Sequence, residues 1–298
     1  MQELIKILIK ENIKFNEEVN IKKYTSYNIG GIVKLMAFPK KREELISILK
    51  IVKKNDIKHI VLGECSNIIF TSDYYDGVVI KTDYLSNIII EDNTVICDAG
   101  VKLVNLSLNL SKKGLSNFEF ASGIPGTVGG GIYMNAGAYN ISISDHLIEA
   151  NILDNNFNII TLKNDELKFD YRYSMLKENK YLIVLGGKFR LKSGDKDEIL
   201  DLIYDRKRRR LESQPLEYPN AGSVFRNPDN NFAGKLIEDL NLKGFSIGGA
   251  KISEKHANFI INDGEATSKD IKKLAEYIKK LVKENYDIEL HMEQEFIK

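Results

Sequence analysis

The pattern of hydrophobic and polar positions predicts a chain that alternates between strands and helices. Residues 41–55 carry apolar side chains at helical spacing and end in lysines, so we predict an amphipathic helix there. The two runs that follow, at 58–63 and 77–82, are mostly apolar, which is typical of short buried strands. This alternation of helix and strands predicts a small α/β unit early in the chain.

The same reading extends through the rest of the chain and changes character near residue 196. It predicts a strand at 93–101, a helix at 102–114 that ends at Gly114, and a hairpin at 147–162 that turns at 154–156. Together these elements predict an α+β protein of two or three domains. The remaining predicted elements are a strand at 181–191, helices at 196–213, 233–244 (ended by glycine) and 268–287 (capped by Ser268), a buried strand within 251–262 and a strand at 288–298.

Composition narrows the class of protein. The 298 residues are 43% hydrophobic and 29% charged, and a net charge of +1 provides no basic field for nucleic acid or an anionic membrane. No apolar run approaches the roughly 20 residues that cross a bilayer, and the lysine-studded N-terminus is typical of an amphipathic helix rather than a signal peptide. The separated Cys65 and Cys97 suit a reducing cytoplasm, and with four scattered histidines they form no metal-ligand spacing.

The most unusual segment is ASGIPGTVGGGIYMNAGAYN, residues 121–140, with six glycines between Gly123 and Gly137. Its G-x-x-G-x-x-G spacing differs from the G-x-G-x-x-G of a Rossmann turn, and the later AGKLIE lacks the Ser or Thr of a phosphate loop. The glycines therefore indicate one of two structures. Either the backbone approaches a pyrophosphate or a ring closely, or glycine bends a core strand and turn.

Other segments carry reactive or charged side chains, each with a purely structural alternative. The turn in LGECSNIIF, residues 62–70, holds a phosphate on its backbone N–H groups or simply ends a strand. Arg172 in DYRYS has the fork geometry that grips a carboxylate, but it also suits stacking on tyrosine at the surface. Ser223 follows a glycine at a loop-to-strand junction and suits a turn equally well. Glu293 and Glu295 lie two apart on the predicted last strand and would share one face.

Taken together and in this order, the motifs resemble the UDP-N-acetylenolpyruvoylglucosamine reductases (UDP-N-acetylmuramate dehydrogenases), FAD enzymes of peptidoglycan precursor synthesis. The resemblance runs from about Thr25 to Ile297 through TSYNIGG, LGECSN, GIPGTVGG, NAGAY, YRYS, AGSVFRNP, AGKLIE, KHANFIIN and a final L-x-x-E. It implies a three-lobed α+β fold, with a non-Rossmann FAD-binding domain of the vanillyl-alcohol-oxidase (PCMH) type and an α+β substrate domain. The implied divisions are FAD lobe 1 at 1–82 with 287–298 returning to it, FAD lobe 2 at 83–195, and a UDP-sugar domain at 196–286.

The resemblance also implies a reaction and its cofactors. Hydride passes from NADPH through FAD to the terminal CH2 carbon of the enolpyruvyl ether of UDP-N-acetylglucosamine, in a cytoplasmic monomer. The residues implied to hold FAD are Gly63, Glu64, Cys65, Ser66, Asn67, Ser122, Gly123, Ile124, Pro125, Gly126, Thr127, Gly129, Gly130, Asn135, Gly137 and Ala138.

Three residues match catalytic positions of the family. Arg172 is implied to stabilise the negative charge that develops at the substrate carboxylate, and Ser223 to deliver a proton to the carbanion. Glu293 is implied to help hold the enolised carboxylate. The chain is compact like the shorter class of the family, which lacks an inserted tyrosine-bearing lid, so the implied substrate contacts are Tyr171, Arg210, Arg226 and Asn227.

Two positions depart from the family pattern. Cys65 stands where the family usually has glycine in the flavin turn. If that position needs a positive φ, Cys65 is strained, and otherwise it packs near the cofactor. Glu295 stands where many members carry arginine, which leaves the charge pattern near Glu293 open.

Two other functions account for part of the pattern. An FAD oxidase of the same superfamily, acting on a sugar alcohol or hydroxy acid, would explain the flavin loops but not the motifs around Ser223 and Glu293. The second alternative is a sugar-nucleotide binder that has kept the fold without catalysis.

Overall fold

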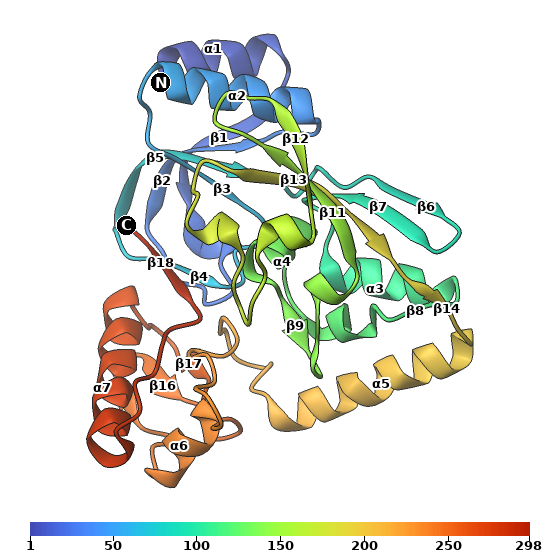
Figure 1. Ribbon diagram of the computed structural model, residues 1–298. Coiled ribbons are helices and arrows are strands. Elements are labelled where there is room, and N and C mark those ends of the chain that lie inside the picture. The colour runs from blue at the N-terminus through green and yellow to red at the C-terminus, as the bar shows by residue number, and fades with distance from the viewer. The chain divides into compact units, whose positions relative to one another are not determined.

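The computed structural model describes all residues from Met1 to Lys298, and the chain folds into two compact units (Figure 1). The first unit comprises Met1–Val19, Lys34–Glu64 and Asp76–Lys207, and the second comprises Asn20–Val33, Cys65–Tyr75 and Arg208–Lys298. The boundary between Glu64, in the first unit, and Cys65, in the second, falls inside the predicted flavin turn.

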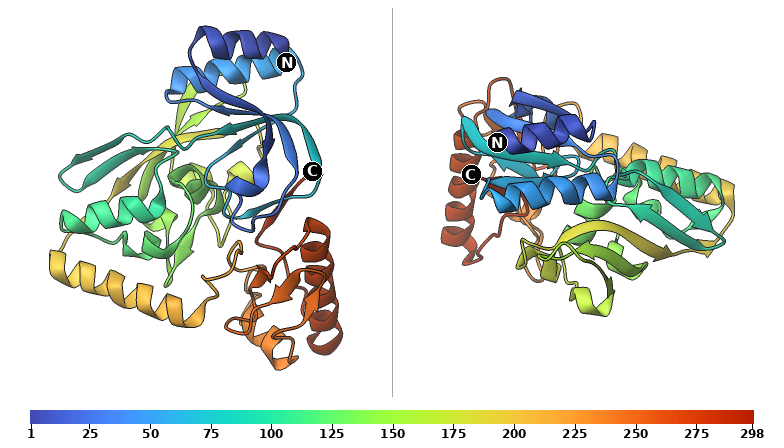
Figure 2. Two further views of the ribbon diagram at one scale, coloured as in Figure 1. Left: turned by 180° about the vertical axis from the view of Figure 1, so that it is seen from behind. Right: turned by 90° about the horizontal axis from the view of Figure 1, so that it is seen from above.

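One layer of the first unit is a four-stranded sheet in the order β1-β2-β5-β3, in which β3 and β5 are parallel. Two amphipathic helices, α1 and α2, lie side by side and bury their apolar faces in a cluster with β2 and β5 (Figures 1 and 2). This layer is the small α/β unit predicted from the first eighty residues. The elements are α1 (Gln2–Lys10), β1 (Lys14–Asn20), β2 (Ile32–Phe38), α2 (Arg42–Lys54), β3 (His59–Leu62) and β5 (Tyr74–Lys81).

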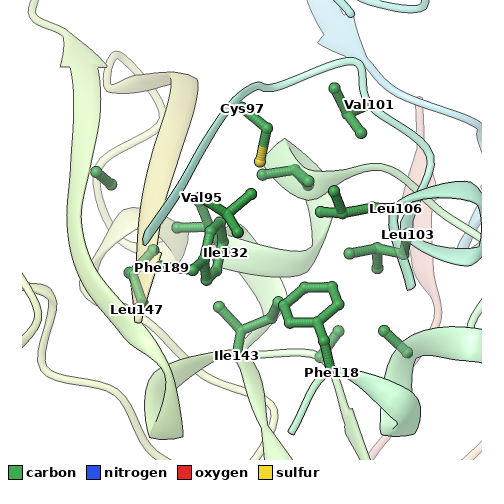
Figure 3. Packing of buried hydrophobic residues seen from close by; sticks show 14 of the residues in the cluster. Val95, Cys97, Val101, Leu103, Leu106, Phe118, Ile132, Ile143, Leu147 and Phe189 are labelled. Carbon is green, nitrogen blue, oxygen red and sulfur yellow. The ribbon is translucent and has the colours of Figure 1, made fainter. Parts of the chain in front are cut away.

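The other layer of the first unit is a five-stranded antiparallel sheet in the order β12-β11-β13-β7-β6. Helices α3 and α4 share its core, where the ring of Phe118 meets that of Phe189 edge-on at 5.5 Å (Figure 3). The elements are β6 (Ile88–Glu91), β7 (Thr94–Asp98), α3 (Leu103–Lys112), α4 (Val128–Met134), β11 (Leu147–Leu153), β12 (Ile159–Lys163) and β13 (Ile183–Arg190), with the two-stranded pairs β8 (Leu115–Ser116) with β14 (Lys192–Ser193) and β9 (Gly137–Ala138) with β10 (Ile141–Ser142).

The second unit packs helices against a three-stranded antiparallel sheet, β15-β16-β17. In the same unit the last strand, β18, pairs in parallel with β4, so the end of the chain joins a segment from its first quarter. The elements are β4 (Ile68–Phe70), α6 (Ala233–Asp239), β15 (Ser246–Ile247), β16 (Ala250–Ile252), β17 (Ile260–Asn262), α7 (Ser268–Tyr286) and β18 (Glu295–Ile297), while α5 (Lys196–Ser213) begins in the first unit and ends in the second.

Most of the predicted helices and strands are confirmed, and three details were wrong. Thr267 rather than Ser268 caps α7, because its hydroxyl accepts from the N–H of Asp270 while that carboxylate accepts from Thr267 N–H at 2.9 Å. Helix α6 ends at Asp239, before the glycine at 244. The last strand spans only Glu295–Ile297, so Glu293 and Glu295 do not share a strand. None of the helices combines the length and apolar character of a membrane span.

Candidate functional site

The predicted flavin turn, Gly63–Asn67, follows β3 and contains a strained residue. Cys65 has a φ of +57° and is only 5% exposed. The left-handed region costs a residue with a side chain about 1–2 kcal/mol. The backbone at this position has a positive φ, and Cys65 is therefore strained.

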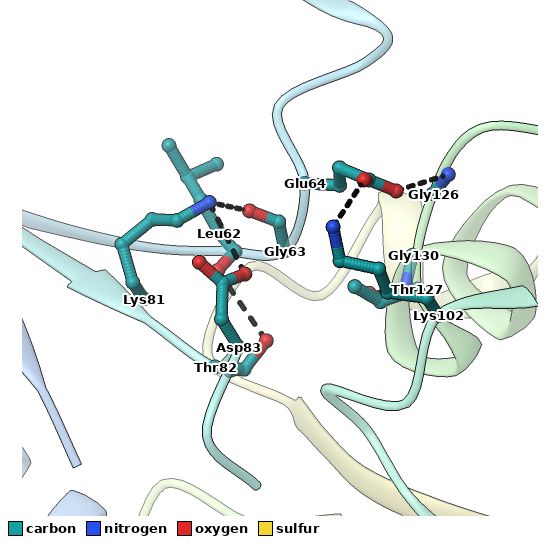
Figure 4. A network of polar contacts seen from close by, with 10 residues as sticks. All are labelled: Leu62, Gly63, Glu64, Lys81, Thr82, Asp83, Lys102, Gly126, Thr127 and Gly130. Atoms are coloured by element: carbon teal, nitrogen blue, oxygen red, sulfur yellow. Dashed lines mark hydrogen bonds and ion pairs between the residues drawn. The ribbon is translucent and has the colours of Figure 1, made fainter. Parts of the chain in front are cut away.

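A buried lysine fixes the start of this turn. Lys81, at the end of β5, is 2% exposed, and its ammonium donates a hydrogen bond to the carbonyl of Gly63 (Figure 4). The same ammonium lies 3.4 Å from a carboxylate oxygen of Asp83. A buried ammonium is costly unless it is paired and hydrogen-bonded, so these contacts hold the Gly63 carbonyl in one orientation.

Glu64 connects the turn to the glycine-rich segment. One of its carboxylate oxygens lies 2.8 Å from the Lys102 ammonium, and the other accepts from the N–H of Gly126 at 2.9 Å (Figure 4). The hydrogen bond to Glu64 raises the pKa of Lys102. Neither Lys81 nor Lys102 was identified from the sequence, because a single lysine after an apolar run is an ordinary feature.

The glycine-rich segment does not form the bent core strand that was one of its two predicted structures. Gly129, Gly130 and Gly131 lie in α4, whose N-cap is Thr127. A Cβ on Gly129 would lie 2.9 Å from that of Ala99, so packing within the protein already requires glycine there. A Cβ on Gly130 would meet only the Thr127 hydroxyl, at 3.7 Å.

The contrast between these glycines tests whether a cofactor fits. Glycine inside a helix costs roughly 0.5–1 kcal/mol relative to alanine. At Gly130 no packing contact within the protein requires glycine, so this destabilising choice has no internal explanation. The room beside Gly130 suits the close approach of a ligand. The two segments predicted to hold FAD also approach each other closely. A Cβ on Gly63, in the flavin turn, would lie 2.3 Å from the hydroxyl of Thr127, in the glycine-rich segment.

Arg172 occupies the tip of a tight turn in which Asp170 and Tyr173 exchange backbone hydrogen bonds of 3.1 and 3.0 Å. Its φ is +56°, and strained residues of this kind concentrate at functional sites. Its guanidinium donates to the carbonyl of Gly137 at 2.7 Å and lies 5.1 Å from the ring centre of Tyr171. These contacts give the cation one orientation.

Asn135 and Gly137, both predicted to hold FAD, contact this turn. The amide of Asn135 donates to the carbonyl of Asp170 at 3.0 Å, and its oxygen accepts from the N–H of Ser144 at 3.1 Å. Gly137 has no room for a side chain, because a Cβ would lie 2.6 Å from the Ile141 carbonyl oxygen. Both residues therefore position Arg172.

The second unit brings together three predicted site residues. Ser223 follows Gly222, whose φ is +74°, and pairs with Phe259 in an isolated bridge. The N–H of Glu293 donates to the carbonyl of the residue after Ser223 at 2.8 Å, while its carbonyl accepts from the Asn67 amide at 3.0 Å. The hydroxyl of Ser223 makes no hydrogen bond within the protein and is half-buried.

Buried polar side chains that were not singled out from the sequence brace this segment. The amide of Gln294 donates to the Ala221 carbonyl at 3.2 Å and accepts from the Tyr27 hydroxyl at 3.2 Å. Burial raises the pKa of Tyr27, so this hydroxyl stays protonated. Asn258 accepts from the N–H of Phe225 and donates to its carbonyl, at 3.0 and 2.8 Å. Tyr27 and Asn258 lie in recognised motifs, whereas nothing in the sequence marked Gln294.

The predicted substrate contacts are spread over both units. Tyr171 is 48% exposed, and the Arg210 side chain donates to Gln214 at 2.6 Å. Asn227 accepts from the first N–H of α6, at Ala233, at 3.1 Å. The other predicted residues lie as follows: Arg226 donates its backbone N–H to His291, Ser122 and Gly123 end a 3-10 helix (Glu119–Gly123), Ile124 and Pro125 lie in the loop before α4, Ser66 lies in the flavin turn and Ala138 lies in β9.

Two family models match separate parts of the chain. Residues 33–163 match a model described as "FAD binding domain", and residues 214–297 match "UDP-N-acetylenolpyruvoylglucosamine reductase, C-terminal domain". A reductase of that name from Caldanaerobacter subterraneus is 44% identical over 97% of this chain and 95% of its own. One from Clostridium novyi is 43% identical over 98% of this chain and 94% of its own.

This chain belongs to the UDP-N-acetylenolpyruvoylglucosamine reductase family. The crystal structure of the family member from Thermus caldophilus has a TM-score of 0.80 with this fold, at 31% identity over 96% of this chain and 99% of that one. The family's fold, an α+β protein with a non-Rossmann FAD-binding domain, is thereby confirmed. The protein is an FAD-dependent oxidoreductase.

The strain at Cys65 predicts an unusual order of stability in this family member. Cys65→Gly and Cys65→Ala both remove the thiol, but only glycine tolerates the left-handed region without strain. We expect the glycine variant to be more stable than the alanine variant by about 1 kcal/mol in urea unfolding.

The matched control is Cys97, which is also buried but lies in β7 without a positive φ. There Cys97→Ala should be the more stable of the two variants. If alanine is also the better residue at position 65, the turn relaxes out of the left-handed region and Cys65 carries no strain.

Proposed function

We propose that this protein is the NADPH-dependent reductase of the enolpyruvyl ether of UDP-N-acetylglucosamine, which produces UDP-N-acetylmuramate for peptidoglycan precursors. The observation that carries the proposal is the match to named reductases at 44% identity over 97% of the chain. The presence of Arg172, Ser223 and Glu293 at positions that match the family's catalytic residues supports it further. We also propose a cytoplasmic location, in keeping with two buried cysteines that form no disulfide, and a monomeric state.

We propose the three-lobed division of the chain at 1–82, to which residues 287–298 return, 83–195 and 196–286. Three separate hydrophobic clusters support it. One cluster lies wholly within residues 95–191, a second draws mainly on α1, α2 and their sheet, and a third draws mainly on residues 221–290.

FAD, when bound, supplies the redox chemistry that carries hydride from NADPH to the substrate. We propose that the turn at 63–67 and the segment at 122–130 hold it. The buried ammonium of Lys81 orients the first carbonyl of the turn, and Gly130 leaves open space beside the second segment. Both features prepare a surface of backbone that a cofactor can approach closely.

The proposed roles of the catalytic residues follow from their surroundings. Arg172, held by its bond to Gly137 and by Tyr171, offers a fixed cation to the substrate carboxylate as charge develops there. Ser223 has a hydroxyl without an internal partner, free to deliver its proton to the carbon beside that carboxylate. A hydroxyl is a weak acid, but a carbanion is a far stronger base. Glu293 is proposed to help hold the enolised carboxylate of the substrate.

Gly130→Ala tests the proposed position of FAD. Because a Cβ fits within the protein at this position, the variant should be as stable as the natural protein or up to about 1 kcal/mol more stable. Its FAD dissociation constant, measured by titration of the apoprotein, should rise at least about tenfold, since the Cβ takes the space of the ligand.

Gly129→Ala is the control, because its Cβ meets Ala99 and should lower the stability by about 1–3 kcal/mol. A Gly130→Ala protein with unchanged FAD affinity would exclude the proposed placement.

Ser223→Ala separates the two halves of the reaction. In stopped-flow experiments NADPH should still bleach the bound flavin, whereas turnover of the enolpyruvyl substrate should fall by a factor of about 10²–10⁴ because the proton donor is lost. Ser193→Ala, in the exposed β14, should leave both steps unchanged.

Unchanged turnover in Ser223→Ala would refute its role as the proton donor. Bleaching by a sugar alcohol or hydroxy acid but not by NADPH would favour the oxidase alternative.

A further inference from the structure

The carboxylate of Glu64 occupies a small anion site made by two groups of the first unit. One oxygen faces the Lys102 ammonium at 2.8 Å, and the other accepts from the Gly126 N–H at 2.9 Å (Figure 4). An ammonium beside a backbone N–H that is not used in secondary structure is a common arrangement for binding a phosphate oxygen.

The backbone holds Lys102 and Gly126 together independently of Glu64. Lys102 pairs with Thr127 in an antiparallel bridge, and the N–H of Leu103 donates to the carbonyl of Gly126 at 2.9 Å. Gly126 has a φ of +147°, a conformation that glycine adopts readily and other residues rarely do. The backbone of Lys102 and the amide of Gly126 are therefore positioned by main-chain contacts, and the carboxylate that their donors hold is the exchangeable part.

Both charged side chains are accessible for such an exchange. The Lys102 side chain is 51% exposed and that of Glu64 is 31% exposed, so a ligand from solvent can reach the pair. A diphosphate brought to this segment would be repelled by Glu64 and attracted by Lys102. Replacing a carboxylate by a phosphate at the same two donors keeps both hydrogen bonds and relieves the repulsion.

We propose that Lys102 and the Gly126 amide bind a phosphate oxygen of the FAD diphosphate, and that Glu64 is an internal anion that fills this position until the cofactor displaces it. The inference rests on the placement of FAD proposed above. It reassigns Glu64 from a cofactor ligand to a competitor of the cofactor, and it adds Lys102 to the cofactor site.

The sign of the effect of Glu64→Gln on FAD affinity is the decisive measurement. Titration of FAD into the full-length apoprotein should give a dissociation constant about fivefold lower for Glu64→Gln, because a competing charge is removed. Lys102→Gln should raise the dissociation constant about tenfold, because a charged hydrogen bond to the diphosphate is lost. The association rate of FAD should also increase in Glu64→Gln.

Glu149→Gln is the matched control, since Glu149 is a similarly exposed carboxylate that pairs with Lys188 elsewhere in the first unit. It changes the net charge equally and should leave FAD affinity unchanged. Weaker binding in Glu64→Gln would show that the carboxylate braces the site and would overturn the proposal, as would values equal to those of the control.

Gly130→Ala shows whether the exchange of Glu64 for FAD is wrong or the proposed placement of FAD itself is wrong. If Gly130→Ala weakens FAD binding while Glu64→Gln and Lys102→Gln match the control, only the exchange is refuted. If Gly130→Ala has no effect on FAD affinity, the placement is refuted and the exchange with it.

Discussion

The absence of a side chain at Gly63 brings the two candidate cofactor segments into direct contact, because a Cβ there would lie 2.3 Å from the Thr127 hydroxyl. That hydroxyl also caps α4, so the turn after β3 rests on the residue that begins the glycine-rich helix. The contacts of Lys81 with Gly63 and of Glu64 with Gly126 are then short and local. The contacts of Glu64 with Lys102 and Gly126, which link the two segments, depend on that close approach.

The flavin turn is fixed at both ends by different means, which explains how the strain at Cys65 persists. Gly63 and Glu64 are held by contacts of the first unit. In the second unit, Asn67 donates to the Glu293 carbonyl, and its own carbonyl accepts from Glu295 N–H, each at 3.0 Å. An unfavourable φ survives only where the surrounding contacts over-determine the backbone.

The spacing of apolar residues predicted most helices and strands, because the buried side chains of each element recur with the residue period of that helix or strand. It could not choose Thr267 over Ser268, since both are good caps and only the reciprocal bond to Asp270 distinguishes them. It could not predict helix α4 either, because three consecutive glycines oppose a helix by propensity. The N–H groups of Val128 and Gly129 bond to the carbonyls of Val101 and Ala99 at 2.8 Å each, and these tertiary contacts outweigh the propensity.

The candidate site shows why glycine counts alone are ambiguous. The proposed catalytic roles of Arg172, Ser223 and Glu293 followed from family motifs, and no periodicity identifies residues as far apart in sequence as Ser223 and Glu293. Within the motif, Gly129 is required by packing on Ala99, whereas Gly130 faces open space beside the same helix turn. Loss of flavin in a Gly129 variant would therefore reflect a disturbed core. Packing within the protein does not require glycine at position 130. A substitution there therefore tests what the cofactor requires, whereas a substitution at Gly129 does not.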